Sequence, residues 1–209
     1  MYNRKDHYYK KAKEEGHASR AVYKLEQIHS KYNVIKKGER VVDLGCAPGG
    51  WMEIVSELVG KNGIVVGIDI LPIKIHIRPN MKFVLGDIND EKAMEQVASL
   101  LNLSITPSHH PTIALADVVI SDMAPNTSGV QFKDAYLSYE LCSKALEIAG
   151  DILKDGGNFV AKIFQGREAD AFKKEMKKVF NGVEAYIPPA TRISSKEFYL
   201  VGIGFNRKG

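Results

Sequence analysis

The sequence is constrained most strongly by the alternation, from residue 40 onward, of short apolar runs with stretches of helical periodicity. We predict strands at 40–44, 63–69, 82–85, 116–121, 158–164, 183–187 and 197–204, and helices at 49–59, 90–100, 134–153 and 168–180. The central runs are nearly continuous in Val and Ile, as are strands that are buried on both faces. This order predicts a doubly wound α/β fold, with a seven-stranded, mostly parallel sheet and helices on both faces.

The length of 209 residues fits one domain with a sizeable core. A helical pattern at 18–30 precedes the first strand, so we expect an N-terminal arm at 1–17 and a single domain at 18–209. Pro107 and Pro111 interrupt the pattern and predict a surface loop at 102–112. The chain has no apolar run long enough to span a membrane, and its first residues are charged, unlike a signal peptide. We therefore expect a cytoplasmic protein without membrane association.

The two cysteines, Cys46 and Cys142, are too few for a disulfide framework. No Cys-x-x-Cys motif or cluster of Cys and His has the spacing of a metal site. We expect free structural thiols and no metal.

The N-terminal arm and the helix after it combine basic side chains with tyrosines, in a chain whose net charge is +4. Such a segment can neutralise phosphates and stack on bases. The residues we predict to contact nucleic-acid phosphates are Lys10, Lys11, Lys13 and Arg20. An ordinary solvated terminus fits the same charge pattern equally well.

A glycine-rich turn, Asp43-Leu-Gly-Cys-Ala-Pro-Gly-Gly-Trp51, follows the first strand and opens a helix. It is not the dinucleotide fingerprint, because Ala47 stands where the second glycine of that pattern is needed. Asp69 ends the second strand, where a carboxylate can accept both ribose hydroxyls of an adenosine. Asp87 follows the third strand and is placed to accept the adenine amino group. Each aspartate alone fits a turn or cap; together with the turn they favour a nucleoside cofactor.

The fourth and fifth strands end in Ser121-Asp-Met-Ala-Pro-Asn126 and Ala161-Lys-Ile-Phe-Gln-Gly166. Adjacent strand ends would bring Asp122 close to Lys162, which lies in an apolar run where a charge needs a partner. The pair is either a structural ion pair or part of a proton-transfer site. Glu197 begins an apolar strand, and Tyr199 shares its face, as a core residue or as support for a target nucleotide.

These motifs, with Ser19-Arg-Ala-Val-Tyr-Lys-Leu25, resemble the FtsJ (RrmJ) family of ribose 2′-O-methyltransferases over nearly the whole chain. The resemblance implies a Rossmann-like class I methyltransferase domain that uses S-adenosylmethionine. The implied catalytic tetrad is Lys24, Asp122, Lys162 and Glu197. The implied cofactor contacts are Gly49, Trp51, Asp69, Asp87 and Asp122.

The family chemistry implies an in-line attack of a ribose 2′-oxygen on the methyl group of the cofactor. We expect neutral Lys162 to take the hydroxyl proton, Lys24 to steady the oxyanion, and Asp122 and Glu197 to orient the lysines. The implied substrate is the A-loop uridine of large-subunit ribosomal RNA, within the large ribosomal subunit. We expect the protein itself to be a monomer. A tRNA anticodon loop and an mRNA cap fit the same chemistry. A non-catalytic RNA-binding assembly factor is the alternative from another class, and a nicotinamide dehydrogenase is disfavoured by the glycine spacing.

Overall fold

The structure is a computed structural model that describes residues 4–102 and 116–207. The predicted loop at 102–112 therefore lies outside the described residues, except for its first residue, which ends a helix. None of the helices in the described ranges has the length and apolar character that a membrane span requires.

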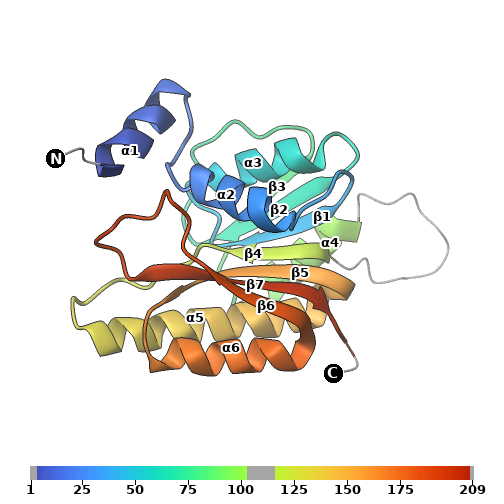
Figure 1. Cartoon of the computed structure of the whole chain (residues 1–209). Helices are drawn as coiled ribbons and strands as arrows, with labels where there is room; N and C mark the ends of the chain where they lie inside the picture. Colours follow the sequence, from blue (N-terminus) through green and yellow to red (C-terminus); the bar gives the residue numbers. More distant parts are fainter. Residues whose placement is uncertain (1–3, 103–115, 208–209) are drawn as a thin grey trace.

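A single sheet organises the molecule. Its strands are β1 (Arg40–Leu44), β2 (Ile64–Asp69), β3 (Met81–Leu85), β4 (Ala116–Ser121), β5 (Leu153–Phe164), β6 (Phe180–Tyr186) and β7 (Glu197–Phe205). They lie in the order β3-β2-β1-β4-β5-β7-β6, with β7 antiparallel to both of its neighbours and the other pairs parallel (Figure 1). The seven-stranded, mostly parallel sheet is confirmed.

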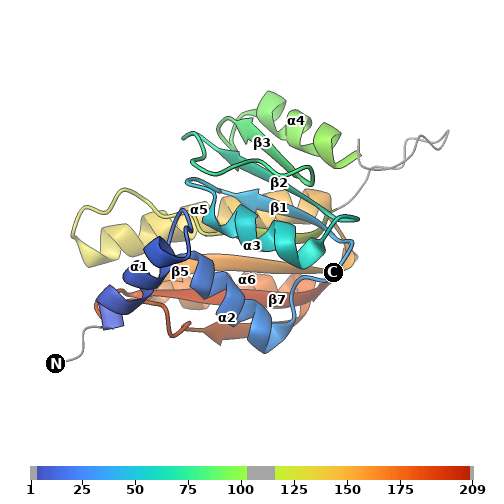
Figure 2. The same cartoon turned by 90° about the horizontal axis from the view of Figure 1, so that it is seen from above.

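Helices cover both faces of the sheet, as predicted. They are α1 (Arg4–Glu14), α2 (Val22–Tyr32), α3 (Gly50–Val59), α4 (Glu91–Asn102), α5 (Gln131–Ile152) and α6 (Arg167–Val179). Helices α2 and α3 lie over one face, nearest the viewer in Figure 2, and α5 and α6 lie under the other. The sheet is thus buried on both faces, which explains its runs of Val and Ile.

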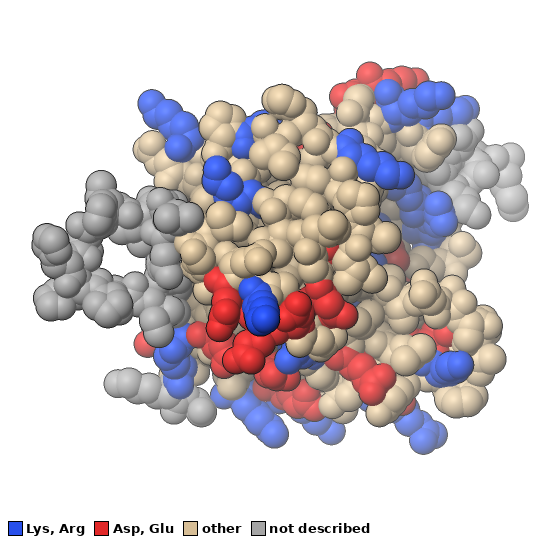
Figure 3. Space-filling view, turned by 180° about the vertical axis from the view of Figure 1, so that it is seen from behind, with Lys and Arg blue, Asp and Glu red and all other residues tan. Residues whose placement is uncertain are grey.

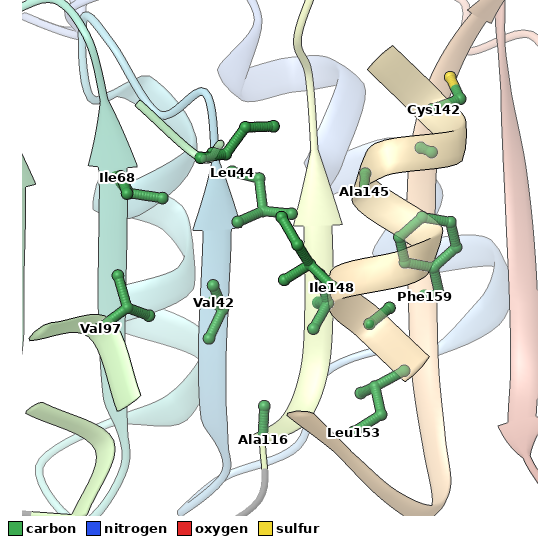
Figure 4. Close-up of a cluster of buried hydrophobic side chains, with 14 of the residues drawn as sticks. Val42, Leu44, Ile68, Val97, Ala116, Cys142, Ala145, Ile148, Leu153 and Phe159 are labelled. Carbon is green, nitrogen blue, oxygen red and sulfur yellow. The ribbon is translucent and has the colours of Figure 1, made fainter. Parts of the chain in front are cut away.

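Each face has its own apolar core. On the α4–α6 face, Val97, Cys142 and Phe159 belong to one cluster, drawn in part in Figure 4. On the α2–α3 face, Leu25 and Trp51 belong to another. These two cores fix the strands, and every strand except the antiparallel β7 presents its carboxyl end at the same edge of the sheet, where β7 begins.

Strand β5 and helix α1 differ most from the sequence prediction. Strand β5 begins at Leu153 rather than at residue 158, because Leu153 pairs with Ala116 before a register shift in the ladder. Helix α1 lies within the arm, a segment in which we predicted neither a helix nor a strand. It is held by contacts with α2: Gln27 donates a hydrogen bond to the Tyr8 hydroxyl (3.1 Å), and the Tyr8 ring lies 5.3 Å from that of Tyr23.

Candidate active site

The glycine-rich turn after β1 is pinned to the end of β2. The backbone N–H of Gly45 donates to the carbonyl of Ile68 (2.9 Å). The N–H of Ala47 donates to the carboxylate of Asp69 (2.8 Å). These bonds hold the turn against the carboxyl edge of the sheet, where ligands bind in open α/β folds.

Glycine is required at two positions of this turn. Gly49 has φ +113°, and a Cβ there would come within 2.7 Å of Ile75. Gly45 has φ +77°, and a Cβ there would come within 2.2 Å of the Met123 side chain. A side chain at either position would therefore strain the backbone and clash, so the residues bordering the turn are close-packed.

Three carboxylates lie at or just after the carboxyl ends of β1, β2 and β3. Asp69 is half-buried and also accepts the N–H of Leu71 (2.8 Å), while Asp87 is exposed and accepts the N–H of Asn89 (2.9 Å). Asp43 is fully buried, and neither of its carboxylate oxygens has a hydrogen-bond partner among the described residues. Burial, with the charges of neighbouring carboxylates, raises the pKa of Asp43 well above its usual range.

A nucleoside that carries a positive charge fits this group of carboxylates better than a pyrophosphate does. Carboxylates accept hydrogen bonds from ribose hydroxyls and amino groups, whereas they repel phosphates. The residues present thus fit S-adenosylmethionine, whose sulfonium is positive, and they fit a nicotinamide dinucleotide poorly.

The Trp51 side chain is buried between α2 and the sheet. Its indole N–H donates to the carbonyl of Ala21 (2.8 Å), and its ring lies 5.8 Å from that of Tyr199. Trp51 therefore supports the packing behind the tetrad, and a contact with the cofactor stays a prediction.

The four predicted tetrad residues meet at this edge as two ion pairs. The Lys24 ammonium lies 2.5 Å from the Glu197 carboxylate, and that of Lys162 lies 3.1 Å from the Asp122 carboxylate. Both lysines are buried, at 6% and 7% exposure. Buried ammonium groups need such partners, so each pair explains how its lysine is tolerated there.

Tyr199 joins the two pairs. Its hydroxyl donates to the Asp122 carboxylate (2.7 Å), and the Lys24 ammonium lies 5.7 Å from the centre of its ring. Strand register produces this arrangement, because Tyr199 lies opposite Lys162 in the β5–β7 ladder. The side chain has no exposed surface, so of the two readings the structure favours the core residue.

The Asp122 carboxylate interacts with Lys162, Lys24 and Tyr199. Burial by itself would raise the pKa of Asp122, but the ammonium groups of Lys162 and Lys24 and the Tyr199 hydroxyl outweigh it and hold that pKa below its usual value. The carboxylate is therefore ionised near neutral pH, and it orients the lysine beside it.

The Lys162 ammonium has one direction left for a substrate. It donates to the main-chain carbonyl of Asp122 (2.5 Å) as well as to its carboxylate. An ammonium carries three N–H donors, so one remains without a partner among the described residues. A hydroxyl group that meets this third position can exchange a proton with the nitrogen.

The arm residues are less closely tied to this centre. Lys10 and Lys13 are exposed on α1, and Lys11 lies 3.7 Å from Glu15 and 4.6 Å from the centre of the Tyr23 ring. The Tyr23 hydroxyl donates to Glu15 (2.6 Å). The arm is therefore a helix fastened to α2 that presents two of its lysines to solvent.

Arg20 lies at the tetrad rather than on the arm. Burial and the nearby charge of Arg192 lower its pKa, while the charge of Glu197 acts in the opposite direction. Arg192 comes from the β6–β7 connection and is exposed. These two guanidinium groups add positive charge beside the two ion pairs.

Comparison with known proteins agrees with this geometry. A family model described as FtsJ-like methyltransferase matches residues 17–205. The chain belongs to this family. The matched region begins just after α1, so this FtsJ-like methyltransferase contains the whole sheet and all four tetrad residues within the family's span.

Several curated relatives of this FtsJ-like methyltransferase are named Ribosomal RNA large subunit methyltransferase E. That of Methanothrix thermoacetophila is 45% identical, over 96% of this chain and 72% of its own. That of Bdellovibrio bacteriovorus is 41% identical, over 97% of both chains.

Solved structures agree with the fold. A Plasmodium falciparum protein titled a ribosomal RNA methyltransferase superposes with a TM-score of 0.73 at 28% identity, over 90% of this chain and 97% of its own. A Methanococcus jannaschii fibrillarin, at 16% identity and a TM-score of 0.53 over 83% of this chain and 69% of its own, shares the fold alone.

Two features of this FtsJ-like methyltransferase were not predicted from the sequence. One is the position of Arg192 near Arg20, and the other is the burial of Asp43 without a hydrogen-bond partner among the described residues. The loop sequence Arg192-Ile-Ser-Ser-Lys-Glu197 carried a signal, since its basic residues precede a tetrad member. The cysteines lie where structural thiols belong: both are free and buried, and burial raises the pKa of Cys142 to about 12.

Proposed function

We propose that this protein transfers a methyl group from S-adenosylmethionine to a ribose 2′-hydroxyl of large-subunit ribosomal RNA, at the A-loop uridine. The observation that carries the proposal is the pair of buried ion pairs joined through Tyr199 at the carboxyl edge of the sheet. The names of the relatives support the ribosomal target. The alternative is a non-catalytic assembly factor, and such a protein would have no need of two buried ammonium groups.

The cofactor supplies an electrophilic methyl group on a positively charged sulfur. In our proposal the glycine turn and the carboxylates of Asp69 and Asp87 hold its adenosine part. Asp43 sits behind the turn, and neither of its carboxyl oxygens has a hydrogen-bond partner among the described residues. Gly49 lets the turn pack against the Ile75 side chain, with which a Cβ at this position would clash.

The target hydroxyl is a weak nucleophile until its proton leaves. We assign the proton to the nitrogen of Lys162, which accepts it in its neutral form at the position that its two protein acceptors leave open. Lys24 faces the same carboxylate and steadies the negative charge that develops on the oxygen. Asp122 and Glu197 fix the directions of the two lysines.

RNA approaches, in our proposal, along the side of the molecule that carries α1. Lys10 and Lys13 are exposed there, and Arg20 extends the positive charge to the tetrad. On the opposite face, acidic side chains gather in the lower middle of the surface in Figure 3, where they would repel phosphates. We therefore assign residues 1–17 as a docking arm on a single domain at 18–209. We also propose that the protein acts as a monomer, on the large ribosomal subunit and in the cytoplasm.

Transfer of labelled methyl from S-adenosylmethionine to large ribosomal subunits that lack the modification tests the proposal. We expect label on a ribose of the A-loop, and its loss in Lys162→Ala. Lys174→Ala, which removes an exposed lysine of α6, is the matched control and should transfer at the wild-type rate. Label on tRNA but not on subunits would replace the substrate. No transfer to any RNA would refute the enzyme and favour the assembly factor.

A further inference from the structure

Two aromatic side chains stand exposed at the start of α5. Phe132 is 76% exposed and Tyr136 is 51% exposed, although phenylalanine is a residue type most often found inside proteins. They are four residues apart on a helix, so they share one face and lie about 6 Å apart along its axis. The Tyr136 ring is backed by Tyr139, 6.4 Å away, which packs edge-on against Phe172. These contacts keep Tyr136 at the surface.

The start of α5 is held rigidly beside the catalytic edge. The Asp134 carboxylate accepts the N–H of Ser128 (2.7 Å) and that of Gly129 (3.1 Å), which fixes the turn before the helix. The Lys196 ammonium donates to the Gln131 side chain (2.5 Å). Lys196 immediately precedes Glu197, and Gln131 immediately precedes Phe132. This hydrogen bond therefore places the exposed aromatic face next to the start of β7. Figure 1 shows the start of α5 and the β6–β7 connection at the same end of the sheet.

Positive charge accompanies the aromatic face. Lys133 lies between the two rings in sequence and is exposed, Lys196 is exposed next to Gln131, and Arg167 is exposed at the start of α6. A Cβ on the residue before Arg167 would lie 2.9 Å from Ala135, so the starts of α5 and α6 touch. The acidic residues nearest in sequence are Asp134, which is already bound within its turn, and Glu140 and Glu168.

We propose that Phe132 and Tyr136 form a stacking platform for unpaired bases of the RNA, on nucleotides that flank the methylated ribose. This inference rests on the proposed function and names how that substrate is held. Aromatic rings interleaved with cations are the usual means of binding unpaired nucleotides, whose bases stack on the rings while the cations meet the phosphates. A second copy of the chain is a poorer fit, because two rings offer at most about 500 Å² and a stable interface needs about 800 Å² from each partner.

Binding of the full chain to an unpaired oligouridine tests the platform directly. Loss of one stacked base weakens binding by about tenfold, so we expect that loss in Phe132→Ala and again in Tyr136→Ala. Phe132→Trp should keep the affinity, and Phe132→Leu should not, since leucine is apolar but offers no ring. The matched control is Ile77→Ala, which removes an exposed apolar side chain before β3. An oligonucleotide with 5-iodouridine should cross-link to one of the two rings on irradiation.

Measurements of methyl transfer test the stacking platform separately from the proposed function. On ribosomal RNA, the alanine variants should raise KM for RNA about tenfold and leave kcat at saturating RNA unchanged. Unchanged oligouridine binding and KM in both variants, with normal methylation, would overturn the platform and leave the function standing. Weakened oligouridine binding without methylation of any RNA by the wild type would support the platform and refute the function. A change in sedimentation of Phe132→Ala with unaltered RNA binding would overturn the platform in favour of a second copy.

Discussion

Replacing Tyr199 with phenylalanine removes one hydroxyl from the centre of the site and leaves the ring in place. That hydroxyl donates to Asp122 at 2.7 Å, and the Asp122 side chain is 20% exposed. A hydrogen bond to a charged group contributes about 1.5–3 kcal/mol, and partial access to water offsets some of its loss. We therefore expect Tyr199→Phe to lower the free energy of unfolding by about 2 kcal/mol.

The loss should appear in both stability and turnover. For a chain of this length, about 2 kcal/mol lowers the melting temperature by about 4–8 °C. Asp122 also orients Lys162, so turnover should fall by about tenfold, which corresponds to about 1.4 kcal/mol in the barrier. Thermal unfolding followed by circular dichroism, and steady-state methyl transfer below the melting range, measure the two effects on one preparation.

The stability difference has a defined pH dependence. Burial opposes ionisation of Asp122, but its cationic neighbours and the Tyr199 hydroxyl keep its folded pKa below the unfolded value of about 3.9. The stability from these contacts is thus fully present above about pH 4 and is lost as the pH falls through the folded pKa. The difference between wild type and variant should be largest at neutral pH and should shrink below about pH 4. A lowered melting temperature with unchanged turnover would refute the claim that Asp122 acts through Lys162.

Four further outcomes follow from the same geometry. Lys162→Met should reduce single-turnover methyl transfer by about 10²–10⁴-fold with RNA affinity retained, and a smaller loss would remove the lysine from proton transfer. Glu197→Ala leaves the Lys24 ammonium buried without its partner, so urea unfolding should show a loss of about 3 kcal/mol. The double variant Lys24→Met, Glu197→Met should recover most of that stability without recovering activity, and equal instability of both variants would contradict this account. Reversing Lys10 and Lys13 to glutamate should weaken RNA binding and flatten its dependence on log[salt], and an unaltered slope would show that the arm does not contact phosphate.

The fold was largely predictable because its strands are buried on both faces and therefore read as apolar runs. Helix α1 was not, because its pattern is polar and only Ala12 among its described side chains is buried. It is held by contacts with residues of α2, among them Gln27 and Tyr23, that no local pattern reveals. The early start of β5 likewise depends on a partner strand far away in sequence.

The resemblance named the residues of the candidate site, but the contacts that connect them were not predictable from the sequence. The resemblance pointed to Lys24 and Glu197, and the structure places them in contact. The hydrogen bond from Tyr199 to Asp122 depends on the insertion of β7 between β5 and β6, in antiparallel register, which strand periodicity does not specify. The burial of Asp43 without a partner could be seen only once the surroundings of the turn were complete.

The ion pair between Lys24 and Glu197 joins positions 173 residues apart. During synthesis the first of these leaves the ribosome early, and the second emerges only with the final strand. The glycine turn and β1 to β4 lie between them in the chain, so a growing polypeptide contains these elements well before it contains the ion-pair partner of Lys24. A copy that ends before β7 therefore lacks the carboxylate that pairs with the buried Lys24 ammonium.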